Sequence, residues 1–200
     1  MHDSPTALLV SAPRSDGLER PEPVPGRSDI PLNAVGRQQA VAAGEELKKC
    51  WDRGAKPITH IVTSPLGRAR ETARAAQTAL ESVQGKAVPL SDDDDLLEVS
   101  FGEKEGHPMG DWYDPWIAGT YLPKGCEPFD DLKSRAISAV NRALEQPHGG
   151  LPLIVAHGAL FRAIRAAMNL PVNVRLPNAT PIYCAFDAGA WSLTPYEITG

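Results

Sequence analysis

The stretch Leu151-Pro-Leu-Ile-Val-Ala-His157-Gly158-Ala-Leu-Phe-Arg-Ala-Ile-Arg-Ala-Ala-Met168 decides the fold. It begins with an apolar run of mostly branched residues, Leu153 to Ala156, which is typical of a strand buried on both faces. The run stops at His157-Gly158, and a helical stripe of apolar residues follows at once. The free backbone N–H groups and the dipole at such a helix start favour an anion. Two interpretations of His157 follow: a core histidine satisfied by a neighbour, or a residue of an anion-binding site.

The rest of the chain alternates between strand and helix patterns. Strands are expected at 7–10, 58–63 and 88–90, helices at 35–53, 65–83 and 129–144, and a closing hairpin at 182–186 and 191–194. Asn33 is expected to cap the first helix, and Ser64-Pro65 is typical of a helix start with Pro in the first turn. This order of elements indicates an α/β layer fold.

The composition fits a cytoplasmic protein and argues against several other classes. The 200 residues are 42% hydrophobic, which is enough for a full core, and the net charge of −5 argues against non-specific nucleic-acid binding. Cys50, Cys126 and Cys184 are too scattered for a disulfide framework. The sequence shows no apolar run as long as a membrane span and no signal-peptide pattern at its start. We expect a cytoplasmic protein without nucleic-acid or membrane partners.

Two segments outside the periodic pattern each allow two interpretations. Asp92 to Asp95 is an acidic run, and we expect a solvated turn rather than a metal site, because adjacent carboxylates repel each other. Residues 99–128 contain aromatic residues among Gly and Pro, and they form either a lid over a site or a cover for the core. These aromatic residues are Trp112, Tyr113, Trp116 and Tyr121.

Four segments together resemble the histidine phosphatase superfamily, which has the phosphoglycerate-mutase-like fold. Residues 64–73, Ser-Pro-Leu-Gly-Arg-Ala-Arg-Glu-Thr-Ala, resemble its helix-opening motif, and residues 155–158, Val-Ala-His-Gly, resemble its second-histidine motif. Residues 97–106 are similar to its acid-bearing loop, and residues 26–40 are similar to its first helix and the preceding loop. The order and spacing of these segments agree along most of the chain.

The resemblance implies a three-layer α/β/α sandwich with a mostly parallel mixed sheet. It also implies one domain over residues 1–200, with a small cap at about 99–128, and a site at the carboxyl ends of the strands. In that family one histidine attacks phosphorus, two arginines and a second histidine hold the phosphoryl oxygens, and an acid protonates the departing oxygen. The chemistry implies no metal and no cofactor.

Three residues match those roles at their positions in this sequence. The resemblance makes Arg68 a phosphate clamp, His157 the second histidine and Glu98 the general acid, with Gly158 beside the phosphate at the helix start. An Arg fork suits phosphate because it donates two parallel hydrogen bonds. The alternatives are that Arg68 is a surface helix arginine and that Glu98 is a capping carboxylate.

The first motif departs from the family pattern. The family's first strand runs into Arg-His-Gly, whereas this strand runs into Ser11-Ala12-Pro13. Ala12 therefore stands at the position of the nucleophile and Ser11 at that of the first arginine. A methyl group cannot attack phosphorus, and a hydroxyl donates one hydrogen bond without a charge. Arg14 and Arg27 are candidates to restore positive charge to the phosphate site, together with the Ser11 hydroxyl.

Three hypotheses about function follow. The first is a protein of phosphomonoesterase descent that binds phosphate or a phosphorylated small molecule, with hydrolysis impaired by Ala12. The second is an active phosphatase, rather than a mutase, that uses a substitute nucleophile; His60 and His107 have no position that fixes them for this role. The third is a non-catalytic protein-interaction scaffold. The apolar C-terminal hairpin is a candidate edge for a homodimer.

Overall fold

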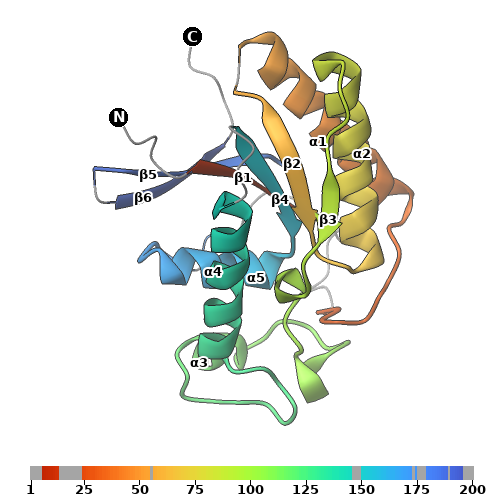
Figure 1. Cartoon of the computed structure of the whole chain (residues 1–200). Helices are drawn as coiled ribbons and strands as arrows, with labels where there is room; N and C mark the ends of the chain where they lie inside the picture. The colour runs from red at the N-terminus through yellow and green to blue at the C-terminus, as the bar shows by residue number, and fades with distance from the viewer. Residues whose placement is uncertain are drawn as a thin grey trace.

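The computed structural model describes residues 6–13, 24–54, 56–145, 150–172, 174, 179–188 and 190–195, and it has one six-stranded sheet between helices (Figure 1). The strand order is β3-β2-β4-β1-β5-β6. The strands are β1 (Thr6–Ser11), β2 (Ile58–Thr63), β3 (Leu90–Asp92), β4 (Leu151–Ala156), β5 (Ile182–Asp187) and β6 (Ala190–Pro195). The first four run parallel, and β5 and β6 form the expected antiparallel hairpin at one edge. The mostly parallel mixed sheet is thus confirmed.

Strand β4 lies at the centre of the parallel part of the sheet, between β1 and β2. All six of its residues are buried, as expected for a strand with a layer packed on each face. Leu153 and Val155 belong to the core on one face, and Ile154 and Ala156 belong to the core on the other. The residues of β4 therefore contribute to the hydrophobic cores on both faces of the sheet.

The helices form the two outer layers of the sandwich. One face is covered by α1 (Ala34–Asp52) and α2 (Gly67–Gln84), and the other by α4 (Phe129–Glu145) and α5 (Gly158–Ala167), as Figure 1 shows. The alternation along β1 fits this arrangement, because Leu8 and Val10 pack toward α1 and α2 while Ala7 and Leu9 lie in the other core. The three-layer prediction is confirmed.

The helix starts explain one correct and one wrong prediction. Asn33 caps α1 as expected, because its side-chain oxygen accepts a hydrogen bond from the Gly36 N–H at 2.8 Å. However, α2 begins at Gly67 and not at Ser64-Pro65. The Ser64 N–H donates to the Val155 carbonyl and so prolongs the sheet by one residue. The α2 terminus is capped from a distant loop instead: the Asp29 carboxylate accepts from the Gly67 N–H at 2.7 Å.

The acidic run lies at the surface, as expected, with Asp92 and Asp94 exposed, and three of its four carboxylates also form ion pairs. Asp92 ends β3 and pairs with Arg70. The other members continue into a short 3-10 helix, η1 (Asp94–Leu96). Arg142 of α4 pairs with both Asp93 and Asp95 at 2.7 Å. The repulsion between neighbouring carboxylates is offset by these arginines, which the local sequence does not reveal.

The segment 99–128 contains a second 3-10 helix, η2 (Gly102–Lys104), and the short helix α3 (Tyr113–Ile117). Tyr113 and Trp116 are buried, Trp112 is half-buried and Tyr121 is exposed. Trp116 packs edge-on against Phe129 at the start of α4, with ring centroids 5.2 Å apart. Most of the aromatic residues thus cover the core of the α4–α5 face, and the lid remains a prediction.

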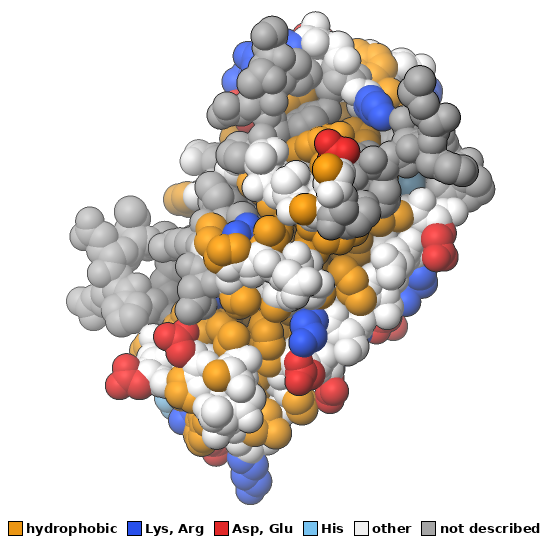
Figure 2. Space-filling model, turned by 90° about the vertical axis from the view of Figure 1, so that its left-hand side faces the viewer, with side chains coloured by type: hydrophobic (Ala, Val, Ile, Leu, Met, Phe, Trp, Pro, Cys, Tyr) orange, Lys and Arg blue, Asp and Glu red, His pale blue; other side chains and the backbone are white. Residues whose placement is uncertain are grey.

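The outer face beyond the hairpin is visible in Figure 2, which views the molecule from the left-hand side of Figure 1. Hydrophobic side chains gather across the middle of this face, and many of the charged side chains lie toward its edges. The expected dimer edge on the hairpin stays a prediction. Within the described part of the chain, none of the helices is apolar and long enough to cross a membrane.

Candidate functional site

Three strand ends meet at one edge of the sheet, because β1, β2 and β4 are parallel neighbours. Ser11 ends β1 and Ala12 follows it, Ser64 comes directly after β2, and His157 comes directly after β4. The Ala12 N–H donates to the Ala156 carbonyl at 2.8 Å, and the Ser64 N–H donates to the Val155 carbonyl at 2.9 Å. Ala12, which stands at the expected position of the nucleophile, thus lies beside the strand that leads to His157, at the carboxyl ends of the strands where open α/β folds keep their ligands.

His157 is a buried imidazole with both a neighbour and a nearby cation. Its Nε2 lies 2.8 Å from the Ser64 hydroxyl oxygen, and its side chain is almost fully buried. Burial, and then the positive charges of Arg68 and Arg135, hold the pKa of His157 well below its usual value of 6.5. The imidazole is therefore neutral at physiological pH. The first interpretation from the sequence is observed, since a polar neighbour satisfies His157, and its part in an anion-binding site stays a prediction.

Arg68 is a buried arginine, so the surface-arginine alternative is wrong. It lies in the first turn of α2 and is only 4% exposed. Its two terminal nitrogens donate to the Ser28 and Gly26 carbonyl oxygens, each at 2.9 Å. Gly26 has φ +51°, and a Cβ there would overlap the Glu105 carboxylate, which explains the glycine. The Arg68 guanidinium thus holds the loop that precedes α1 while its charge acts on His157.

Glu98 places its carboxylate at the start of the helix that follows His157. Oε2 accepts from the Ala159 N–H at 3.3 Å, and Oε1 accepts from the Leu160 N–H at 3.3 Å and from the Val99 N–H at 3.0 Å. The side chain is 7% exposed. The helix terminus that was expected to favour an anion is therefore occupied by a carboxylate of the chain itself. The capping alternative is observed, and the acid role stays a prediction.

The remaining candidates for the phosphate site lie in different surroundings. Arg27 donates from Nε to the Glu98 carbonyl at 3.2 Å and pairs with Glu127 at 3.4 Å, so its guanidinium is engaged at the acid-bearing loop. Ser11 is buried at the end of β1, next to Ala12. Arg14 lies outside the described residues. The parts of Ser11, Gly158 and Arg27 in phosphate binding stay predictions.

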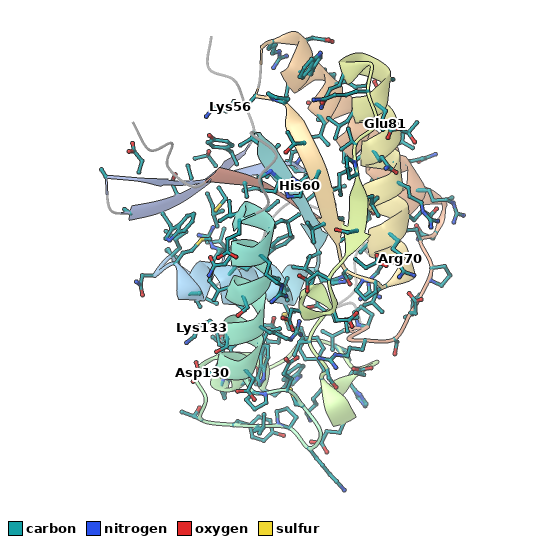
Figure 3. All side chains as sticks on the ribbon, viewed as in Figure 1. Lys56, His60, Arg70, Glu81, Asp130 and Lys133 are labelled. Atoms are coloured by element: carbon teal, nitrogen blue, oxygen red, sulfur yellow. The ribbon has the colours of Figure 1, made fainter. Side chains whose placement is uncertain are left out.

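The other histidines of the described chain lie away from this site or at its outside. His60, labelled in Figure 3, is buried on β2 and its Nε2 lies 3.0 Å from the Ala143 carbonyl oxygen of α4. His107 is exposed, and its Nδ1 lies 3.2 Å from the Glu105 carbonyl oxygen. Neither contact brings an imidazole to the Ala12 position.

Sequence reasoning missed three residues that support the site. Ser64 was interpreted only as a helix start, although its hydroxyl is the polar neighbour of His157. Glu127 and Arg135 form a largely buried ion pair with nitrogen–oxygen distances of 2.6 and 2.9 Å. The local sequence indicates only that Arg135 lies three positions after Leu132, next to the apolar stripe of α4, and gives no sign of its partner Glu127. Among the residues that the structure describes, no cluster of His, Cys, Asp and Glu could hold a metal ion.

Comparison with known proteins identifies related sequences. The model of the histidine phosphatase superfamily (branch 1) matches residues 18–199. The chain is 30% identical to the uncharacterized phosphatase PhoE of Bacillus subtilis, covering 86% of this chain and 84% of that one. It is also 30% identical to the probable phosphoglycerate mutase GpmB of Yersinia enterocolitica, with 88% and 82% covered.

Solved structures agree with this fold. A mycobacterial glucosyl-3-phosphoglycerate phosphatase in complex with inorganic phosphate has a TM-score of 0.70, with 24% identity and 95% of each chain covered. A phosphoserine phosphatase variant from Entamoeba histolytica in complex with phosphoserine also has a TM-score of 0.70, with 21% identity and 94% of each chain covered. Sequence identities of 21% and 24% show that these two proteins share the fold of this chain, and nothing more. The motif segments, the sheet order and the match over most of the chain lead to one conclusion: this chain belongs to the histidine phosphatase superfamily.

Proposed function

We propose that this chain binds phosphate or a phosphorylated small molecule between Arg68 and His157, and that its hydrolysis of phosphomonoesters is weak or absent. One observation carries the proposal. Arg68, in the first turn of α2, and His157, directly after β4, are both buried, and the Arg68 charge acts on His157, while Ala12 beside the end of β4 carries no nucleophile. Arg68 would grip the phosphoryl oxygens, and neutral His157 would donate or accept a hydrogen bond according to its tautomer.

Two of the related structures support the binding part of this proposal. The mycobacterial phosphatase is in complex with inorganic phosphate. The Entamoeba phosphoserine phosphatase is a His-to-Ala variant, and it is in complex with phosphoserine. A member of this fold that has lost a histidine to alanine therefore still accommodates a phosphomonoester. By analogy, the alanine in this chain removes a reactive atom without closing the site.

The catalytic part of the proposal rests on what the remaining groups can do. Covalent catalysis by a histidine divides one difficult step into two easier ones, and Ala12 excludes that route. In serine hydrolases that have lost their nucleophile, charge stabilisation leaves a rate of about 10³–10⁴ over water. Arg68, His157 and Glu98 would give residual catalysis of that kind. We place the chain in the phosphatase line rather than among mutases, since the cap of about 99–128 is small.

Titration calorimetry with orthophosphate, vanadate and phosphoserine tests the binding. We expect heat for at least one of them in the unaltered chain and at least tenfold weaker binding in Arg68→Lys, because lysine cannot reproduce the fork. Arg70→Lys is the matched control, since Arg70 lies two residues away and pairs with the exposed Asp92 instead. No heat for any of the three anions at moderate salt would contradict the proposal.

A colorimetric assay with a generic aryl phosphate tests the catalytic part. We expect turnover far below that of an ordinary phosphatase. Turnover of about 1–10 per second, which is common for enzymes, would instead show an active hydrolase with a substitute nucleophile. Binding without turnover favours the proposal over both that hydrolase and an interaction scaffold.

A further inference from the structure

Two arginines from distant parts of the chain converge on the peptide of Glu98. Arg27, in the loop before α1, donates from Nε to the Glu98 carbonyl oxygen at 3.2 Å. Arg135, in α4, donates from a terminal nitrogen to the same oxygen at 3.3 Å. Arg135 also donates to the Leu97 and Asp95 carbonyl oxygens at 2.6 and 2.7 Å. The backbone carbonyls of Asp95, Leu97 and Glu98 are thus held by guanidinium groups.

One carboxylate holds both arginines. Glu127 accepts from Arg135 Nε at 2.6 Å and from a terminal nitrogen of Arg135 at 2.9 Å, and it pairs with Arg27 at 3.4 Å. The Glu127 and Arg135 side chains are only 13% and 14% exposed, so solvent screens their attraction little. Although burial acts in the opposite direction, the two arginines lower the pKa of Glu127 below its usual range. Glu127 is therefore the shared anion of a triad in which the pair with Arg135 is largely buried and Arg27 is exposed.

The backbone of the same segments joins the triad to the acid-bearing loop. The Glu127 N–H donates to the Ser100 carbonyl at 2.8 Å, so Glu127 is fixed to the chain two residues beyond Glu98. The peptide of Arg27 lies between Gly26 and Ser28, whose carbonyls receive the Arg68 guanidinium. The triad therefore connects the loop held by the phosphate clamp with the loop that carries the acid.

We propose that Glu127 is a positioning residue for Glu98: by fixing Arg27 and Arg135, it holds the Glu98 peptide so that the Glu98 carboxylate stays at the first turn of α5, beside His157. This inference rests on the proposed function, because Glu98 matters for ligand binding only if the site binds a phosphorylated ligand. Glu127 has no direct role toward the ligand in this proposal. Its effect on the site passes entirely through the placement of Glu98.

Two amide protons report this placement without any ligand. The first N–H groups of a helix have no acceptor within the helix, so the protection of the Ala159 and Leu160 amides depends on Glu98. Hydrogen exchange measured by NMR should therefore be about tenfold faster at these two amides in Glu98→Ala. We expect a similar increase in Glu127→Gln, while amides inside β4 keep their protection. Glu103→Gln is the matched control, because Glu103 is an exposed residue of the same segment.

The double variant distinguishes positioning from general loosening. If Glu127 acts through Glu98, adding Glu127→Gln to Glu98→Ala leaves the exchange at Ala159 and Leu160 unchanged. Additive increases, or wild-type exchange at both amides in Glu127→Gln alone, would overturn the proposal. Should Glu127→Gln fail to fold, Arg27→Gln serves instead, because the Arg27 side chain is 44% exposed and its loss removes one arm of the triad. Unchanged exchange at both amides in a folded Arg27→Gln counts against the proposal in the same way.

Calorimetry with phosphoserine then separates this inference from the proposed function. We expect Glu98→Ala and Glu127→Gln to change the affinity for phosphoserine by the same factor, with no further change in the double variant. If the unaltered chain binds no anion, the proposed function fails, although the exchange result stands. The positioning inference fails alone in a different case: the unaltered chain binds phosphoserine, Glu98→Ala changes the affinity, and Glu127→Gln leaves it unchanged.

Discussion

The Nε2 atom of His157 and the hydroxyl oxygen of Ser64 lie 2.8 Å apart in a region closed to solvent. The two residues end neighbouring parallel strands, β4 and β2, so the sheet itself brings them together. The hydroxyl gives the imidazole a polar partner that burial would otherwise deny it. Burial of the imidazole, and then the positive charges of Arg68 and Arg135, lower the pKa of His157 and so set how the site responds to pH.

Protein stability should fall as the pH drops below about 6.5. In that range the imidazole of the unfolded chain takes up a proton that buried His157 does not, because its pKa in the folded state is lowered. The slope approaches about 1.4 kcal/mol per pH unit between 6.5 and the lowered pKa. Urea denaturation at a series of pH values measures it. His157→Gln should flatten the profile, and His107→Gln should not, since His107 is exposed.

Removing the Arg68 fork should weaken the fold as well as anion binding. Arg68→Lys cannot reach both the Gly26 and Ser28 carbonyls, so we expect a loss of about 1–3 kcal/mol in the free energy of unfolding. Arg70, labelled in Figure 3, makes an exposed pair with Asp92, and Arg70→Lys should cost far less, because solvent screens such a pair. Equal losses in the two variants would show that the Arg68 contacts contribute little.

Restoring the family's first motif should create hydrolysis. The double variant Ser11→Arg, Ala12→His should raise turnover of an aryl phosphate by at least about 10²–10³-fold, because a nucleophile and a phosphate clamp return together. The same assay on Ser11→Arg, Ala12→Gln provides the control, since that variant gains the charge but no nucleophile. A rise of similar size in the control would attribute the gain to charge alone.

The Asp29 carboxylate should stabilise α2 although it is far from that helix in sequence. Asp29→Ala leaves the Gly67 N–H without its acceptor, and we expect a loss of about 0.5–2 kcal/mol in thermal or urea unfolding. Asp29→Asn keeps an acceptor oxygen and should lose much less. A loss of equal size in both variants would mean that the charge, rather than the hydrogen bond, stabilises the helix terminus.

The elements of the fold were largely readable from local pattern. The limits of β2 are those expected, because branched residues from Ile58 to Thr63 stand between a proline and the Ser64-Pro65 turn. Asn33 caps α1 as its type and place indicate. The start of α2 was misplaced, because the bond from Ser64 to Val155 joins residues far apart in the sequence, and periodicity carries no information about such bonds.

The same reason explains which parts of the site were missed. Motif resemblance identified Arg68, Glu98 and His157 as candidates. In the structure the Arg68 charge acts on His157, and the Glu98 carboxylate caps the helix that follows His157. The partners of these residues are tertiary: the Glu98 carboxylate meets amides 61 and 62 positions away. Likewise, Arg135 reaches the carbonyls of residues 37 to 40 positions earlier in the chain. No local spacing predicts these contacts.

The turn after β1 has a consequence for how this protein can change. Ala12 is held through its amide by the Ala156 carbonyl, and the Ser11 carbonyl accepts from the Ala179 amide, so both positions are secured by main-chain atoms. Such bonds are indifferent to the identity of the side chain. The main-chain bonds that hold this turn therefore form with or without a reactive side chain, so a change of chemistry at these positions need not remove them.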